Sequence, residues 1–198
     1  MDASKLTSVS LLDRLKSAKP DDPQWRRLHD IYEPWIRAWL ARAGESQSDV
    51  QDLTQDVLLV LVRELPGFHR QRDGSFRRWL GQVLLNRVRS QWKQRKRRPR
   101  VGFDGDSDGG FLEQLEDPAS ALSLQWDREH DQFVLRRLMT AVEHDFHANT
   151  WQAFRRCTLD GAAAATVSAE LGMTVNAVLV AKSRVLRRLR EEAAGLID

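Results

Sequence analysis

The stretch AAAATVSAELGMTVNAVLVAKSRVLRRLR, residues 162–190, decides the fold of the C-terminal part of the chain. It begins with small residues that allow close helix packing, Gly172 can turn the chain, and Thr174 suits the N-cap of a following helix. The residues after Thr174 place their apolar side chains on one side of a helical wheel. That side consists of Val178, Ala181, Val185, Leu186 and Leu189. We therefore predict two helices joined by a tight turn.

The opposite side of the second predicted helix suits the major groove of DNA. In a helix-turn-helix, the N-terminal residues of this helix lie nearest the base edges and its arginines lie nearest the phosphates. The apolar Leu179 and Val180 fall there, and apolar side chains can contact thymine methyl groups. The alternative is a surface helix of an ordinary bundle with solvated arginines. The outward residues are Asn176, Val180, Ser183, Arg184 and Arg187.

The rest of the chain is also predicted to be helical, because apolar residues recur at three- and four-residue steps. Helices are expected at about 6–15, 25–44, 50–65, 76–92, 122–146 and 151–158. The fold class is therefore all-α, with two small helical domains joined by a flexible acidic linker. The expected boundaries are 1–98, 99–121 for the linker, and 122–198 for the helix-turn-helix domain.

Charge is unevenly distributed along the chain. The totals nearly balance, with 31 Lys and Arg against 28 Asp and Glu. Residues 77–100 nevertheless contain many bases and no acid, whereas residues 104–117 contain acids and no base. The Gly-rich acidic stretch at 102–118 has turn composition, which predicts a flexible linker.

Aromatic residues alternate with arginines in the basic region. Phe76, Trp79 and Trp92 lie among cations, a composition that suits single-stranded nucleic acid because bases stack on rings. Core packing is the alternative for Trp79 and Trp92, since both fall at helical spacing from the apolar stripe. The basic run can equally be a solvated block with generic affinity for polyanions.

Several classes of protein are not expected. A single cysteine, Cys157, excludes an intrachain disulfide, the N-terminus lacks a signal-peptide core, and no apolar run is long enough for a membrane span. We expect a cytoplasmic protein without membrane insertion. His144 and His147 lack further partners for a metal, and neither a nucleophile motif nor a phosphate loop is present. No catalytic residue, metal or cofactor is predicted, and the chain is not expected to be an enzyme.

Three stretches together resemble a known family. SDVQDLTQDVLLVLV, GSFRRWLGQVLLNRVRSQWKQRKRR and VSAELGMTVNAVLVAKSRVLRRLRE, in this order, are similar to the two-domain extracytoplasmic-function sigma factors of bacterial RNA polymerase. The resemblance implies that the helix at 49–62 docks on the clamp helices of the polymerase's largest subunit. The implied docking residues are Asp49, Asp52, Gln55 and Asp56.

The resemblance also assigns two DNA-contacting segments. The segment at 76–96 would melt the minus-ten element, with Asn86 near the pocket for an extruded base. Its implied contacts are Phe76, Arg78, Trp79, Asn86, Arg87, Arg89, Lys93 and Arg95. The implied contacts for the minus-thirty-five element are Asn176, Leu179, Val180, Ser183, Arg184, Arg187 and Arg188. Many family members carry Arg-Ser-Arg where this chain has Leu-Val-Ala at 179–181.

The resemblance implies a sigma factor that directs core RNA polymerase to promoters and helps melt them. Its expected partners are core polymerase and promoter DNA, both duplex and melted, with an anti-sigma factor as a further candidate. The linker acids can mimic nucleic-acid phosphate, or the linker can be a simple tether. The alternative function is a stand-alone helix-turn-helix regulator with an N-terminal dimerisation or sensing bundle.

Overall fold

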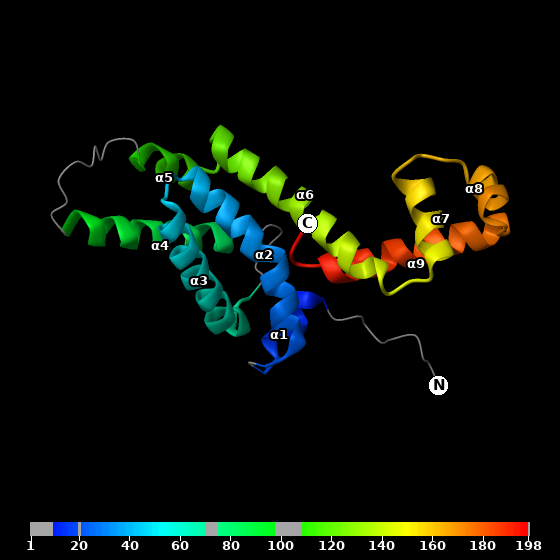
Figure 1. Cartoon of the computed structure of the whole chain (residues 1–198), viewed down its shortest axis with the longest axis horizontal. Helices are drawn as coiled ribbons and strands as arrows, with labels where there is room; N and C mark the ends of the chain where they lie inside the picture. Colours follow the sequence, from blue (N-terminus) through cyan, green and yellow to red (C-terminus); the bar gives the residue numbers. More distant parts are fainter. Residues whose placement is uncertain (1–9, 20, 70–74, 98–107, 198) are drawn as a thin grey trace. The chain divides into compact units, whose positions relative to one another are not determined.

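The computed structural model describes residues 10–19, 21–69, 75–97 and 108–197. Within these ranges the chain is helical and contains no β-strand, which confirms the all-α prediction (Figure 1). The α-helices are α1 (Leu11–Lys16), α2 (Pro23–Arg42), α3 (Gln47–Glu64), α4 (Ser75–Arg97), α5 (Asp108–Glu116), α6 (Ala121–Glu143), α7 (Ala148–Thr158), α8 (Ala164–Leu171) and α9 (Val175–Ala193). A short 3-10 helix, η1 (Leu65–Gly67), follows α3.

The chain divides into two compact units at a different place from the predicted boundary. The described residues of 11–134, with 195–197, form an N-terminal unit, and residues 135–194, with Ser10, form a C-terminal unit. Helix α6 therefore contributes its first half, 121–134, to the N-terminal unit and its second half to the C-terminal unit. The predicted boundary at 121 differs because Trp126 and its neighbours on α6 are core residues of the N-terminal unit.

The predicted flexible linker also differs from the structure where it is described. Residues 99–107 lie outside the described residues, but the remainder contains helix α5. Leu112 and Leu115 of α5 are buried, and the ring of Phe111 lies 6.3 Å from that of Trp39 on α2. The acidic, Gly-rich composition concealed this short amphipathic helix, because few apolar residues are enough to hold it against a neighbouring surface.

Local sequence sets the starts of α2 and α3. Asp22 caps α2 by accepting a hydrogen bond from the Gln24 backbone N–H at 2.8 Å, and Pro23 occupies the first turn. Ser46 caps α3 by accepting from the backbone N–H of Asp49. Both helices then bury one apolar face in the N-terminal unit.

Tryptophans form the centre of the N-terminal unit. The ring of Trp126 on α6 lies 5.3 Å from that of Trp35 and 4.8 Å from that of Trp39, both on α2. On its other side Trp126 faces Gly81 of α4, where an added Cβ would lie 3.6 Å from the indole. This is an ordinary van der Waals distance, so the Trp126 indole packs directly on α4 at Gly81 as well as on α2.

The C-terminal unit contains the predicted pair of helices with a tight turn. Gly172 ends α8 with a φ of 62°, a left-handed conformation that favours glycine, and Thr174 caps α9 by accepting from the Ala177 backbone N–H at 3.1 Å. Both sequence predictions are confirmed. The axes of α8 and α9 differ by 103°, and α7 completes the core by burying Ala153 and Phe154.

Replacing Trp126 by alanine is expected to destabilise the N-terminal unit by about 3–5 kcal/mol, because the substitution removes a large ring from a packed core. The free energy of unfolding in urea, followed by far-UV circular dichroism, measures this effect. Leu124→Ala on the same helix is the control, since Leu124 is exposed and its loss should change the free energy by less than about 0.5 kcal/mol. Equal effects of the two substitutions would contradict the described position of α6.

Candidate nucleic-acid interface

Helix α3 presents an acidic and apolar face away from the core. Asp52, Gln55 and Asp56 are exposed, and their spacing places them on the side opposite the buried Val50, Leu53 and Val57. Leu59 lies at the centre of this face with 66% of its surface exposed. We call Asp52, Gln55, Asp56 and Leu59 the α3 face.

Leu59 is a candidate functional residue that the family resemblance does not point to. Its helical spacing from Val57 and Leu61 already places it away from the buried stripe, and this was the signal available in the sequence. An isolated exposed leucine needs no explanation, but one among exposed acids on a predicted docking face does.

Asp49 has a different role from the predicted one. Its carboxylate accepts hydrogen bonds from the Gln91 side-chain amide of α4, at 2.6 Å, and from the Ser46 hydroxyl. The side chain is half-buried and connects the start of α3 to α4. Asp49 therefore positions the α3 face and does not present a free carboxylate on it.

Helix α4 leaves one polar stripe exposed. Arg78, Asn86 and Lys93 are exposed at intervals of eight and seven residues, and Arg89 lies between them on the same side. The amide oxygen of Asn86 accepts a hydrogen bond from Gln82 Nε2 at 3.1 Å, one turn earlier. We call Arg78, Gln82, Asn86, Arg89 and Lys93 the α4 stripe, and it contains four of the predicted minus-ten contacts.

Phe76 is not available for base stacking. Only 1% of its surface is exposed, and its ring packs edge-on against Tyr32 at 5.5 Å and against Phe68 at 5.8 Å. In this structure Phe76 is a core residue, and its predicted contact with DNA stays a prediction. Trp79 is half-buried and also packs on Phe68, at 5.2 Å.

The remaining predicted minus-ten residues lie elsewhere or are not described. Arg87 is half-buried and projects from a different side of α4, about 100° around the helix from Asn86. Arg95 belongs to α4, but its side chain lies outside the described residues. Trp92 donates a hydrogen bond from Nε1 to Glu45 Oε1 at 2.6 Å, and this bond attaches the end of α4 to the loop before α3.

Arg89 of the α4 stripe is paired with an acid of the predicted linker. Its guanidinium forms an ion pair with Glu116 of α5. The hydrogen bond within this ion pair raises the pKa of Arg89 and lowers the pKa of the Glu116 carboxyl. Both side chains remain about a third exposed, and pairs of this kind contribute only about 0–1 kcal/mol. The pair therefore adds little to the stability of the N-terminal unit.

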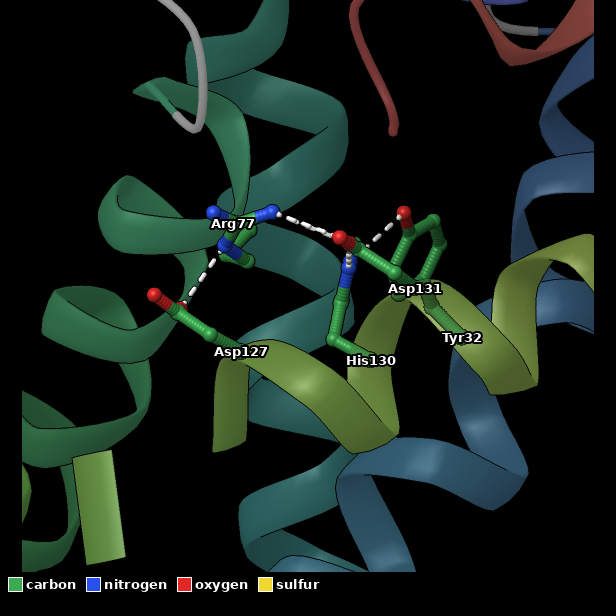
Figure 2. Close-up of polar contacts among 5 residues, drawn as sticks. All are labelled: Tyr32, Arg77, Asp127, His130 and Asp131. Carbon is green, nitrogen blue, oxygen red and sulfur yellow. Dashed lines mark hydrogen bonds and ion pairs between the residues drawn. The ribbon is translucent and has the colours of Figure 1, made fainter. Parts of the chain in front are cut away.

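A partly buried polar cluster fixes the orientation of α4 (Figure 2). Arg77 of α4 lies between two acids of α6, with Nε 2.7 Å from Asp127 Oδ1 and Nη1 2.9 Å from Asp131 Oδ2. Asp131 also lies 3.0 Å from Nδ1 of His130, and Nε2 of His130 lies 3.2 Å from the Tyr32 hydroxyl of α2. The cluster connects α2, α4 and α6 on the inner side of α4.

Burial and charge shift the pKa values in this cluster. Burial lowers the pKa of His130 below its ordinary 6.5 despite the opposing effect of Asp131, which favours the neutral ring in the folded protein. Burial also raises the pKa of Tyr32. For Asp131 burial acts to raise the pKa, but hydrogen bonding to His130 and the charge of Arg77 prevail and lower it.

Helix α9 presents most of the predicted duplex contacts on one face. Asn176, Leu179, Val180, Ser183, Arg184 and Arg187 are all exposed. Arg188 is not free to hold phosphate, because it forms ion pairs with Asp145 at 3.0 Å and with the buried Glu192. Both partners lie in the C-terminal unit, so Arg188 attaches α9 to the turn between α6 and α7.

Neither a metal cluster nor a single membrane-spanning helix is found among the described residues. No group of three or more His, Cys, Asp or Glu side chains there could hold an ion. No single described helix combines the length and apolar character needed to cross a membrane; α8 and α9 meet that test only as a pair bent by 103°.

Part of the N-terminal unit matches a known protein family. Residues 28–98 match the family model of sigma-70 region 2. The matched segment runs from α2 through α4 and contains both the α3 face and the α4 stripe. The match supports a sigma-70 family factor with a general role in RNA polymerase binding and promoter melting. A search of curated proteins gave no significant match.

The buried neutral His130 predicts that acid destabilises the N-terminal unit. The unfolded chain takes up a proton at this residue near pH 6.5, before the folded protein does. The free energy of unfolding should therefore fall as the pH drops from 7 to 5, by at most about 1.4 kcal/mol per pH unit for this one group. The contribution of Asp131 falls in a separate window, below its ordinary 3.8.

Urea unfolding at a series of pH values measures this slope. His130→Gln should flatten it between pH 7 and 5, whereas His144→Gln, at an exposed position on the turn after α6, should leave it as in the wild type. An unchanged slope in the His130 variant would show that other groups cause the acid sensitivity.

Proposed function

We propose that this chain is a two-domain sigma factor of the extracytoplasmic-function type. It binds core RNA polymerase, recognises the minus-thirty-five element with α9, and holds one melted strand of the minus-ten element on α4. A protein that works with RNA polymerase on promoter DNA is expected in the cytoplasm. An anti-sigma factor that covers one of these surfaces is a further candidate partner.

One observation carries the proposal: the segment matched to sigma-70 region 2 exposes two different surfaces on adjacent helices. The α3 face combines carboxylates with an exposed leucine, which suits a protein partner. The α4 stripe combines an amide with cations, which suits an unpaired base and its phosphates. The bonds from α4 to Asp49 and Glu45 hold the two surfaces in a fixed relation.

The division of labour follows from the chemistry of the two surfaces. A docking face rich in acids repels DNA, so it is suited to a basic surface on the polymerase. Extruding a base costs a few kcal/mol, and contacts to the unpaired strand have to supply this free energy. The exposed amide of Asn86 has both a donor and an acceptor for the edge of such a base.

Removing the carboxylates of the α3 face tests the docking role. Asp52→Ala combined with Asp56→Ala should weaken binding to bacterial core polymerase by about tenfold or more, measured as a dissociation constant by fluorescence anisotropy. Asp30→Ala is the matched control, because Asp30 is an exposed acid on another helix of the same unit. Unchanged core binding by the double variant would exclude this face as the docking site.

The role of Asn86 is tested separately. Asn86→Ala should bind core polymerase as the wild type does but form about tenfold fewer open complexes in abortive transcription, because the extruded base loses its contact. Gln82→Ala is the control: it removes the hydrogen bond between the two amides and leaves Asn86 in place. If the Gln82 variant has the same defect, the effect is due to the stripe as a whole and Asn86 has no special role.

A further inference from the structure

The exposed face of α9 begins with apolar side chains. Leu179 is 50% exposed and Val180 is 47% exposed, and Val175 in the first turn is also exposed. The first two turns, residues 175–181, contain no Arg or Lys, and the next basic residue, Lys182, is half-buried. In this part of the helix Asn176 is the one polar side chain.

The rest of the C-terminal unit fixes which residues of α9 face outward. Val178, Ala181 and Val185 are buried on the inner side of the helix. Arg188 adds its ion pair to Asp145 at the other end. Helix α9 therefore cannot rotate to exchange Leu179 and Val180 for other side chains.

The later turns of the same face indicate a phosphate-bearing partner. Arg184, Arg187 and Arg190 are exposed there. The acids near the end of α9 do not cancel this charge: Glu192 is buried with Arg188, and Glu191 lies 3.9 Å from Arg187, at the limit of an ion pair. An apolar tip followed by arginines is complementary to the floor of a DNA groove bordered by phosphates.

The base edges that this tip can read are limited by chemistry. Guanine is typically recognised by the bidentate donors of Arg or Lys, and neither occurs in the first two turns. Apolar side chains contact the C5 methyl group of thymine, and an asparagine amide pairs with the N6 and N7 edge of adenine.

We propose that α9 recognises an A·T-rich duplex through thymine methyl groups, which Leu179 and Val180 contact, with Asn176 on adenine. The inference rests on the proposed function, because it names the bases read by the upstream-binding helix of a sigma factor. It also explains why this helix tolerates two exposed apolar side chains that would otherwise be a liability in water.

Replacing thymine by deoxyuridine tests the inference directly, because this change removes only the methyl group. The full chain, reconstituted with bacterial core polymerase, first selects promoters from a pool with a randomised upstream element. Competition binding then compares the selected duplex with the same duplex carrying deoxyuridine in that element. Each contacted methyl group should contribute about fourfold to affinity, which corresponds to about 0.8 kcal/mol.

Variants of the protein identify the side chains responsible. In Leu179→Ala and Val180→Ala the difference between thymine and deoxyuridine should shrink, while binding to the deoxyuridine duplex stays close to that of the wild type. Leu159→Ala is the matched control, since Leu159 is 52% exposed in the same unit but lies outside α9, and it should retain the full methyl effect.

The outcomes separate this inference from the proposed function. Promoter selection with equal affinity for thymine and deoxyuridine duplexes would overturn the methyl reading and leave the sigma-factor proposal intact, as would a selected element that depends on guanine. Loss of core binding in the α9 variants would show that the apolar tip docks on protein, and would also overturn it. If the wild type selects no promoter and does not bind core polymerase, both proposals fall together.

Discussion

The packing of the first half of α6 against α2 and α4 is the constraint on which the N-terminal unit depends. Trp126 packs against Gly81 of α4, and Arg77 lies between Asp127 and Asp131 in a half-buried site. Removing one acid would leave the guanidinium of Arg77, of which only 17% is exposed, with fewer compensating charges. The cluster therefore specifies one position of α4 relative to α2 and α6, in addition to the apolar core.

The position of α4 determines which of its side chains the N-terminal unit exposes to a ligand. Most described residues of this helix are buried or half-buried, so a ligand would contact α4 mainly at the α4 stripe. The hydrogen bonds to Asp49 and Glu45 then relate the α4 stripe to the α3 face on the neighbouring helix. In the exposed pair of Arg89 with Glu116, an anionic group contacts a guanidinium of the α4 stripe. In the proposed function, the stripe would hold a DNA phosphate through the same kind of contact.

The sequence predicted those features that depend on local chemistry. Helical periodicity indicated the all-α fold, glycine at 172 and threonine at 174 marked the turn before α9, and spacing placed Asp52 and Asp56 on an outward face. Features that depend on distant partners were not predictable in this way. Asp49, Phe76 and Arg188 have side chains suited to binding, but Gln91, Tyr32 and Asp145 engage them within the fold. The amphipathic helix α5 was hidden by its acidic and Gly-rich composition.

The central claim is that promoter opening requires both this chain and core polymerase. Permanganate footprinting measures it directly, because thymines become reactive when they unstack in melted DNA. Reactive thymines should appear near the start site only when the full chain and core polymerase are both present, at an asymmetric promoter. Tight binding of the chain alone to a palindromic duplex as a dimer, without reactive thymines, would contradict the sigma-factor function and favour a stand-alone regulator.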